Sequence, residues 1–363
     1  MAAMAFQWSL AALKTLMAED QMDQHATVLR AFSVVELWRL RRVCRAFHRW
    51  GTAALAALPR VVAVGGQNGE FTGGATGYAD TAGVEVLDLS THRWSSGAVP
   101  ALPEGRGRQA TCSFGDGRRV VVAGGGRFAR TALQWAPGTP AWAALPDMAE
   151  TRNGAAAVRL PDGRVVVIGG YCGRYLASGE ALAADGSGWS ALTPMGKART
   201  SPTAAVLPCG KVLVAGGFDG NLALKVAELW DPATGVWSDL PPMAEGRGAA
   251  GCCVLRSGQV AVVGGYDNND GYAHLRTGEV FDPEAQTWQP LPPMAHERQL
   301  LGVVAVAGGL LAVGGNEDVP NELFDEETGR WFELPHPMAD PRYSTSLVSL
   351  PAAALAPPPA AGP

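Results

Sequence analysis

The sequence lacks long apolar runs. None of its uninterrupted apolar stretches approaches the roughly 20 residues that a membrane-spanning helix needs. The first residues, MAAMAFQWSLAALK, contain neither a basic leader nor a clear cleavage site for a secretory signal. These two absences predict a protein of the cytosol (cytoplasmic) or the nucleus that makes no contact with a membrane.

Cysteine and histidine are also scarce. The six cysteines follow neither a disulfide framework nor a metal-binding spacing, and there are only six histidines. Asp270 and His274 stand four residues apart, but transition-metal sites generally need three protein ligands or more. The sequence therefore predicts no bound metal and no cofactor. Buried, reduced thiols are predicted for the cysteines in short runs of small and apolar residues, which are Cys112, Cys209, Cys252 and Cys253.

Positive charge is in the minority. The net charge is −5, from 29 Lys and Arg against 34 Asp and Glu. Residues 1–58 hold seven basic and four acidic residues, a net charge of +3, and the remainder holds 22 against 30, a net charge of −8. An acidic main body argues against general binding to nucleic acid.

Glycine, in contrast, is plentiful, and part of it belongs to a phrase that recurs six times. Each copy has a Gly-Gly doublet at the end of an apolar run, then a Trp, a Leu-Pro segment and an Arg. The doublets begin at Gly65, Gly124, Gly169, Gly216, Gly264 and Gly314. The tryptophans are Trp94, Trp142, Trp189, Trp237, Trp288 and Trp331. The arginines are Arg106, Arg152, Arg199, Arg247, Arg298 and Arg342, at successive spacings of 46, 47, 48, 51 and 44. A period of this size is typical of stacked units in a propeller.

One copy shows how a unit is built. Its four segments with strand character are residues 248–255, 259–265, 277–282 and 287–294. The first is small and apolar, as the crowded centre of a ring requires, and the last contains prolines, which an outer edge strand tolerates. The Gly-Gly doublet lets another backbone or a ring approach closely, and we expect the Trp to fill the gap between neighbouring sheets. This pattern resembles the kelch repeat, which implies an all-β fold, a six-bladed kelch β-propeller over residues 60–350.

The two ends of this region predict how the ring closes. Before the first doublet there is a second strand but no first one, and after the last arginine, residues 343–350 form a first strand without a second. We expect residues 343–350 to complete the blade that begins at residues 60–100, because the shared blade removes an open sheet edge. The second copy, residues 131–142, is the loosest, since it lacks the Glu-x-x-Asp found in four other copies, at residues 85–88, 228–231, 279–282 and 322–325. Residues 351–363 are rich in Pro and Ala and are predicted to be disordered.

The chain before the propeller is predicted to be helical. Residues 1–22 are an extension, and residues 23–58 contain a shorter helix over 24–32 and a longer one. A capping box of Ser33 and Glu36 starts the longer helix, and Gly51 ends it. Arginines cover much of this helix, and its single apolar stripe consists of Leu37, Leu40, Val43, Cys44 and Phe47.

The stripe resembles the second half of an F-box, whose pattern is Leu-x-x-Leu-x-x-Val-Cys-x-x-Phe or Trp. The Leu-Pro that opens an F-box is absent. The resemblance implies that the five stripe residues dock an Skp-family linker and, through it, a cullin. Two other interpretations stay open, a helical cap packed under the propeller and a basic amphipathic helix that touches a membrane or calmodulin.

The loops after the second strand of each blade are the predicted binding region. They vary in length and chemistry, and the six repeated arginines open the first strands at the same mouth of the ring. The kelch resemblance implies that some of these arginines hold acidic peptide segments, for which a guanidinium is suited; the alternative is an architectural role. Aromatic residues in these loops are the second set of candidates, either as partner contacts or as packed loop residues: Tyr171, Tyr266 and Tyr272, with Tyr78 and Tyr175.

The sequence thus favours a protein-binding role without chemistry of its own. The main hypothesis is the substrate receptor of an SCF-type ubiquitin ligase, whose propeller mouth binds a target protein while the front helices dock the linker. One alternative is a kelch interaction scaffold, for example cytoskeletal, without a ubiquitin role. The other is a kelch-propeller enzyme that acts on a small sugar or specialised metabolite.

Overall fold

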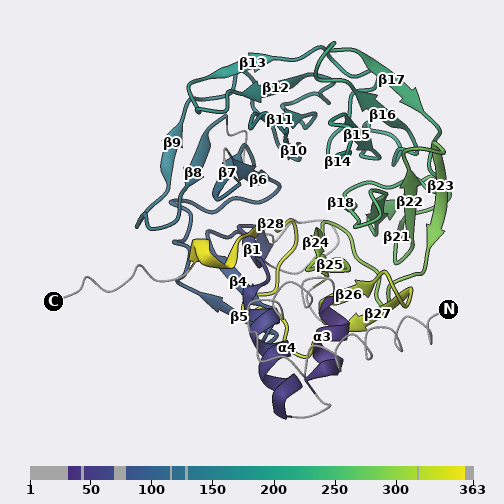
Figure 1. Ribbon diagram of the computed structural model, residues 1–363. Coiled ribbons are helices and arrows are strands. Elements are labelled where there is room, and N and C mark those ends of the chain that lie inside the picture. The colour runs from purple at the N-terminus through teal and green to yellow at the C-terminus, as the bar shows by residue number, and fades with distance from the viewer. Residues whose placement is uncertain are drawn as a thin grey trace.

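The computed structural model describes residues 32–41, 45–68, 79–114, 117–126, 130–316 and 319–355. Six four-stranded antiparallel sheets form a ring, which confirms the predicted propeller (Figure 1). Blade 1 consists of β28 (Ser346–Leu350), β1 (Arg60–Val64), β4 (Val84–Asp88) and β5 (Arg93–Ser96). Blade 2 consists of β6 (Ala110–Phe114), β7 (Arg119–Ala123), β8 (Ala132–Trp135) and β9 (Ala143–Leu145). Blade 3 consists of β10 (Ala156–Arg159), β11 (Val165–Ile168), β12 (Gly179–Leu182) and β13 (Trp189–Ala191).

The other three blades repeat this order, from an inner strand at the central channel to an outer strand at the rim. Blade 4 consists of β14 (Thr203–Val206), β15 (Val212–Ala215), β16 (Ala227–Trp230) and β17 (Trp237–Leu240). Blade 5 consists of β18 (Gly251–Val254), β19 (Val260–Val263), β22 (Gly278–Asp282) and β23 (Thr287–Leu291). Blade 6 consists of β24 (Gly302–Val306), β25 (Gly309–Val313), β26 (Glu322–Asp325) and β27 (Arg330–Glu333). Loop hairpins pair β2 (Gln67–Asn68) with β3 (Ala79–Asp80) and β20 (Tyr266–Asp267) with β21 (Ala273–His274).

The second strands form the core of the ring. All four residues of β11, β15 and β19 are buried, because each blade packs both of its faces against neighbouring blades. The sequences of such strands are unbroken runs of β-branched or apolar residues, because neither face of the strand is exposed to solvent.

Strand β28 closes the ring as predicted. It pairs antiparallel with β1, and Val348 lies opposite Val62. The first blade therefore combines strands from both ends of the propeller sequence, and no sheet edge is left open at the closure.

The repeated tryptophans lie between neighbouring blades, also as predicted. The indole N–H of Trp189 donates to the carbonyl oxygen of Pro146 in the preceding blade at 2.8 Å. The same type of bond, to the Leu-Pro segment of the preceding blade, is made at 2.7–2.9 Å by Trp142, Trp237, Trp288 and Trp331. Five of the six tryptophans thus join two blades by packing and by one hydrogen bond, whereas Trp94 Nε1 has no hydrogen-bond partner among the described residues.

Two helices precede the propeller where one long helix was expected. The capping box is confirmed, since the backbone N–H of Glu36 donates to Ser33 Oγ at 3.2 Å and that of Ser33 donates to Glu36 Oε2 at 2.7 Å. However, α3 (Val34–Leu40) ends early, and α4 (Arg45–Ala57) runs on past Gly51. Gly51 therefore does not end a helix; a Cβ there would lie only 2.9 Å from Arg41 Cγ, so glycine allows α4 to pack closely on α3. The expected helix over residues 24–32 lies almost entirely outside the described residues.

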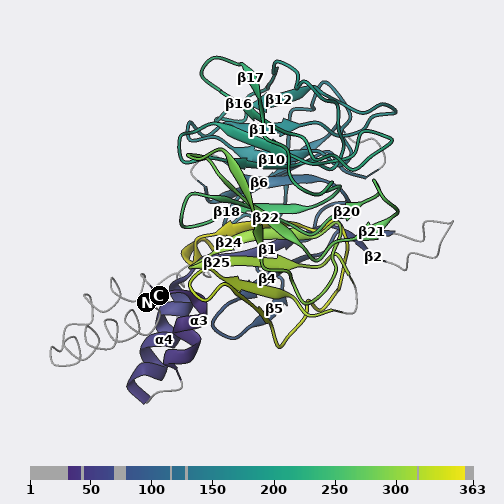
Figure 2. The same ribbon diagram turned by 90° about the vertical axis from the view of Figure 1, so that its right-hand side faces the viewer.

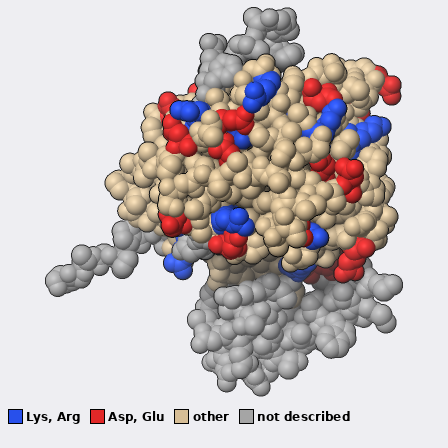
Figure 3. Space-filling view, turned by 90° about the horizontal axis from the view of Figure 1, so that it is seen from above, with Lys and Arg blue, Asp and Glu red and all other residues tan. Residues whose placement is uncertain are grey.

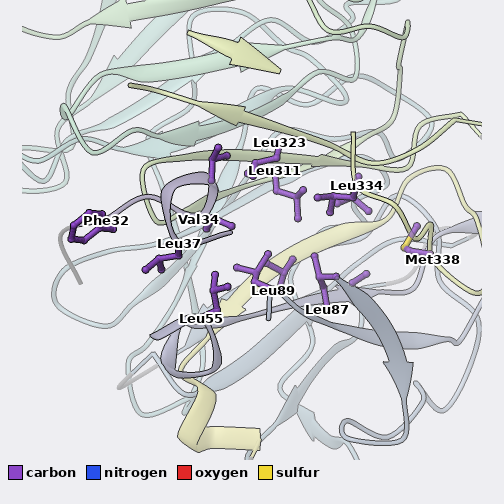
Figure 4. Packing of buried hydrophobic residues seen from close by; sticks show 14 of the residues in the cluster. Phe32, Val34, Leu37, Leu55, Leu87, Leu89, Leu311, Leu323, Leu334 and Met338 are labelled. Atoms are coloured by element: carbon purple, nitrogen blue, oxygen red, sulfur yellow. The ribbon is translucent and has the colours of Figure 1, made fainter. Parts of the chain in front are cut away.

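Helix α3 packs its apolar stripe onto the propeller. Leu37 and Leu40 are buried, and they belong to the same cluster as Leu87, Leu89 and Leu311 of blades 1 and 6 (Figure 4). Three hydrogen bonds accompany this packing. They run from Val34 N to Ala307 O at 3.0 Å, from Trp38 Nε1 to Leu89 O at 3.0 Å and from Arg41 Nη1 to Ser90 O at 2.7 Å. For the part of the stripe that is described, the structure corresponds to the helical-cap interpretation.

The helices and the strand-two loops lie at opposite ends of the ring. Figure 2 shows α3 and α4 at one end of the propeller axis and the β2 and β20–β21 hairpins at the other. No helix within the described residues is long and apolar enough to cross a membrane.

Two sequence predictions need correction. Residues 351–363 were expected to be disordered from their start, but Ala352–Leu355 form a 3-10 helix, η1, because Leu355 packs against the core of blades 1 and 2. Cys209 was expected to be buried, but it is exposed in the turn between β14 and β15. Cys253 is buried as expected, and burial raises the pKa values of the partly covered Cys112 to about 12 and Cys252 to about 11.

The packing of α3 predicts a large loss of stability on truncation. Leu37→Ala should lower the free energy of unfolding by about 2–5 kcal/mol, because Leu37 is fully buried and the change leaves a cavity. Chemical denaturation of the full chain measures this difference. The matched control is Leu222→Ala, a leucine that is 47% exposed, for which we expect a change within about 0.5 kcal/mol. Equal effects of the two changes would show that α3 does not pack on the propeller.

Candidate binding site

The six repeated arginines lie inside the ring rather than on its mouth. Each of these residues is at most 2% exposed. In the third blade, Arg152 Nη1 donates to the carbonyl oxygens of Gly169 at 3.0 Å and Ser178 at 2.9 Å, and its Nε donates to Glu180 Oε1 at 3.1 Å. One guanidinium therefore ties the ends of β11 and β12 to the segment that enters the blade.

The glutamate completes this network. The carboxylate of Glu180 also accepts from the backbone N–H groups of Ala149 at 2.7 Å and Glu150 at 3.2 Å. The same pairing recurs in four other blades, in which Arg199, Arg247, Arg298 and Arg342 bind Glu228, Glu279, Glu322 and Glu85 respectively. A buried ion pair is tolerated only when further hydrogen bonds satisfy both charges, and this arrangement does so.

This burial corrects one prediction of the sequence. A partner was expected to contact Arg106, Arg152, Arg199, Arg247, Arg298 and Arg342, but their guanidinium groups have no surface to offer because they are enclosed between strands and carboxylates. The alternative, an architectural role, is the one that the structure shows.

Blade 2 departs from the network in a coordinated way. Leu133 stands where the other blades have the glutamate, opposite Val122 in the strand register. Pro103 stands at the position equivalent to Ala149 and has no N–H to offer a carboxylate. Consequently Arg106 Nε is buried without a hydrogen-bond partner in the described chain, and Arg106 Nη2 binds the exposed Glu104 at 2.8 Å. Blade 2 is the loosest copy in the sequence. It therefore also has the weakest arginine network at its seam, by which we mean the junction between one blade and the blade before it.

A ring of left-handed residues surrounds the channel, two positions after each arginine. Their φ angles lie between +48° and +66° at Arg108, Gly154, Ser201, Ala249, Leu300 and Ser344. Backbone N–H groups donate from one blade to the carbonyl of the preceding blade, for example from Gly154 to Arg108 at 2.9 Å and from Ser344 to Leu300 at 2.7 Å. Five of these positions are not glycine, so the chain accepts strain of about 1–3 kcal/mol at each. The sequence carries no signal for this ring, because Arg, Leu and Ala do not favour positive φ.

The predicted loop tyrosines gather beside this ring. Tyr171 and Tyr175 come from blade 3, Phe218 from blade 4, and Tyr266 and Tyr272 from blade 5. Their rings form a continuous arc, with successive centroid distances of 5.1, 5.8, 6.1 and 5.4 Å. Together they line one side of a cavity of about 440 Å³, which we call the tyrosine pocket.

Backbone pairing sets the position of three of these rings. These three residues, each directly after a Gly-Gly doublet, are Tyr171, Phe218 and Tyr266. The backbone of each one both donates a hydrogen bond to and accepts a hydrogen bond from the residue that follows a buried arginine. For Tyr266 this partner is Gly248, at 2.8 Å, and the ring of Tyr266 lies where a Cβ on Gly248 would be. Phe218 was missed by the sequence reasoning, although its place after a doublet is a signal that would have found it.

The remaining lining of the tyrosine pocket is polar. It includes Asn153, Thr200, Asn268 and Gln299, and the hydroxyl of Tyr272 donates to Gln299 Oε1 at 2.8 Å. Burial, with a smaller contribution from Tyr272, raises the pKa of Tyr266 to about 12, so its phenol stays protonated at neutral pH.

Arg108 supplies the positive charge of the pocket. It comes from blade 2, which faces blade 5 across the ring, and it is close enough to lower the pKa values of Tyr266 and Tyr272 against the effect of burial. Its side chain is exposed, and its guanidinium makes no hydrogen bond or ion pair within the part of the chain that the structure describes. The pocket thus offers five rings, several neutral hydrogen-bonding groups and one unpaired cation.

The other predicted site residues fall elsewhere. Leu37 and Leu40 lie under the propeller, Val43 and Cys44 are outside the described residues, and the same is true of the side chain of Phe47. Tyr78 is also outside them. His274 packs edge-on against Tyr272 at 5.4 Å, and the described residues contain no group of three or more side chains placed to hold a metal ion.

Comparison with known proteins agrees with the repeat pattern. Residues 199–244 and 247–295 match the family model of the kelch motif. No curated protein matches the sequence. Among solved structures, the fold is similar to that of YjhT, with a TM-score of 0.60 and 13% sequence identity over 69% of this chain and 90% of that chain. The chain is therefore an all-β, six-bladed propeller with kelch motifs.

The irregular seam of blade 2 yields a prediction about the energetic coupling between positions Leu133 and Pro103. Leu133→Glu should lower the free energy of unfolding less in a Pro103→Ala background than in the natural chain. The reason is that alanine restores the N–H that holds the carboxylate beside Arg106 Nε. Chemical denaturation of the two single variants and the double variant should give a favourable coupling of about 0.5–3 kcal/mol. Strict additivity of the two changes would contradict the proposed role of the missing N–H.

Proposed function

We propose that this protein is a non-catalytic interaction scaffold whose tyrosine pocket binds an exposed segment of a partner protein. The observation that carries the proposal is the convergence of five aromatic rings from three blades on one cavity, with the unpaired Arg108 beside them. Tyr and Arg are enriched among the residues that dominate protein–protein affinity. The kelch motifs and the propeller fold support the same class of function.

The rigidity of the pocket supports binding further. Backbone hydrogen bonds hold Tyr171, Phe218 and Tyr266 at equivalent positions, so little freedom is lost when a ligand arrives. The cavity of about 440 Å³ has room for a few side chains of a partner rather than a folded domain. Because Arg108 can pair with a carboxylate in bidentate fashion, we expect the bound segment to contain Asp or Glu.

The lining of the pocket favours binding over chemistry. Its described residues include no Asp, Glu, His, Cys or Lys, and the raised pKa of Tyr266 makes its phenol a poor general base at neutral pH. We therefore propose that the chain is not an enzyme. Charged residues of both signs are interspersed on the rim face seen in Figure 3, without an extended basic stripe among the described residues of that face.

The ubiquitin-ligase receptor hypothesis requires in addition that a linker reach α3. Leu37 and Leu40, two of the residues assigned to that contact, pack against Leu87 and Leu311 of the propeller. A linker that used them would have to displace α3 from blades 1 and 6. For this reason we propose the scaffold role without the linker contact.

Peptide display against the full chain tests the pocket. We expect enriched peptides to contain acidic residues, and their affinity to fall about 5–30-fold in Tyr266→Ala and in Arg108→Met, since each change removes one of the main contacts. Leu222→Ala, on an exposed leucine outside the pocket, is the control and should leave the dissociation constant unchanged. Peptides that bind the three variants and the natural chain equally would place recognition elsewhere. Binding of small sugars without any peptide would favour the enzyme alternative.

A pull-down with purified Skp-family linker and cullin separates the scaffold from the receptor. We expect the immobilised full chain to retain neither protein above the level of uncoated beads, because α3 is occupied by the propeller. An established F-box protein on the same beads is the positive control. Retention of the linker by this chain would replace the scaffold proposal with the receptor role.

A further inference from the structure

A second cavity lies at the end of the ring opposite the mouth, where α3 and α4 meet blades 1 and 6. Its volume is about 450 Å³, and its lining includes Trp38, Arg39, Arg41, His48, His92 and Phe332. We call it the junction pocket. It shares no residue with the tyrosine pocket, and the function proposed above makes no use of it.

Among the described residues, every titratable group that lines the junction pocket is basic. Within that part of the chain, Arg39 and Arg41 have no ion pair and the lining contains no carboxylate. This is unusual in a protein of net charge −5, in which five of the six buried arginines of the ring bind a buried glutamate. Unpaired cations that converge on one cavity attract an anion.

The two arginines are held in place without being neutralised. Arg41 Nη1 donates to the carbonyl oxygen of Ser90 at 2.7 Å, which leaves its other N–H groups available. The guanidinium of Arg39 lies over the ring of Phe332, 5.9 Å from the centroid. A carbonyl bond and a ring contact orient a guanidinium but do not cancel its charge.

His92 adds a free hydrogen-bonding group. Its ring lies edge-on to Trp38 at a centroid distance of 4.1 Å, and its Nε2 is buried without a hydrogen-bond partner among the described residues. Burial and the positive charges of Arg41 and His336 lower the pKa of His92. The carboxylate of Asp88 acts in the opposite sense on this pKa but is already bound to Ser90 and Arg60.

We propose that the junction pocket is a binding site for an organic phosphate, that is, a phosphate group carried on a ring-shaped body. Phosphate offers several acceptor oxygens and up to two negative charges, which suit the two guanidinium groups together with the histidine nitrogens better than a single carboxylate does. Trp38 and Phe332 form apolar walls beside these donors, against which a flat ring can pack.

The site would join the helices to the ring. The ligand would contact Arg39 and Arg41 from the α3 region, His92 from the β4–β5 turn of blade 1 and Phe332 from blade 6. Because it binds these elements only when they are packed together, it stabilises the folded chain by an amount that grows with the logarithm of its concentration once the site is filled.

Phenyl phosphate is the probe for this proposal. Inorganic phosphate and phenol, which represent its two halves, are the comparison ligands. Calorimetric titration of the full chain should show phenyl phosphate binding more tightly than either half. Arg39→Met should weaken it at least tenfold without unfolding the chain, since the guanidinium of Arg39 makes no hydrogen bond to another described residue. Arg41→Met should have a similar effect.

The controls fix where the probe binds. Arg276→Met, on an exposed arginine outside both pockets, should leave the affinity unchanged, and chemical denaturation of each variant should confirm that it is folded. Absence of binding to the natural chain, equal affinity in Arg39→Met, or equal loss in Arg276→Met would overturn the proposal. Loss in Arg108→Met alone would also overturn it, by placing the anion at the mouth.

Discussion

A buried guanidinium at each seam between blades is the interaction on which this propeller depends. An arginine without surface exposure is costly to fold unless its donors find acceptors, and five of the six seams meet this condition with two strand-end carbonyls and one buried glutamate. Arg106 in blade 2 is the exception. The glutamate in turn binds two N–H groups of the incoming segment. Five of the six seams are therefore held by a buried ion pair and by backbone hydrogen bonds, and five repeated tryptophans add an indole hydrogen bond between blades.

The tyrosine pocket, which is the proposed binding surface, follows from that constraint. Because the arginine fixes the chain just before the first strand, the next residues are fixed as well. In blades 3, 4 and 5, one of them pairs with the aromatic residue after the Gly-Gly doublet, and in every blade the next lies in the left-handed ring around the channel. The tyrosine pocket is thus a rigid consequence of the seam network, although none of the seam arginines touches it. Arg108, two residues beyond a seam arginine, is the charged residue among the described residues that line the cavity.

At the opposite end, the front helices behave as part of the propeller. Their apolar stripe covers blades 1 and 6, the seam at which the chain closes on itself, and a hydrogen bond from Val34 to Ala307 joins helix and blade directly. An apolar helical stripe shows the same sequence pattern whether it packs on its own domain or on another protein. Packing decides between the two, and here the described part of the stripe packs on its own domain.

The sequence by itself determined the number of blades, the closing strand, the place of the tryptophans and the capped start of α3. These features depend on periodic patterns and on local hydrogen bonds, which are visible within one copy. It also indicated Tyr171, Tyr266 and Tyr272 as loop aromatics. Only the tertiary structure decided that the six arginines are enclosed, that Phe218 joins the tyrosines and that Gly51 lies inside a helix. Each of these depends on what lies across a seam or a helix pair, on atoms distant in the sequence. The sequence pattern of a repeated arginine is the same whether the residue has an architectural role or contacts a partner, and only its neighbours in the folded structure distinguish the two.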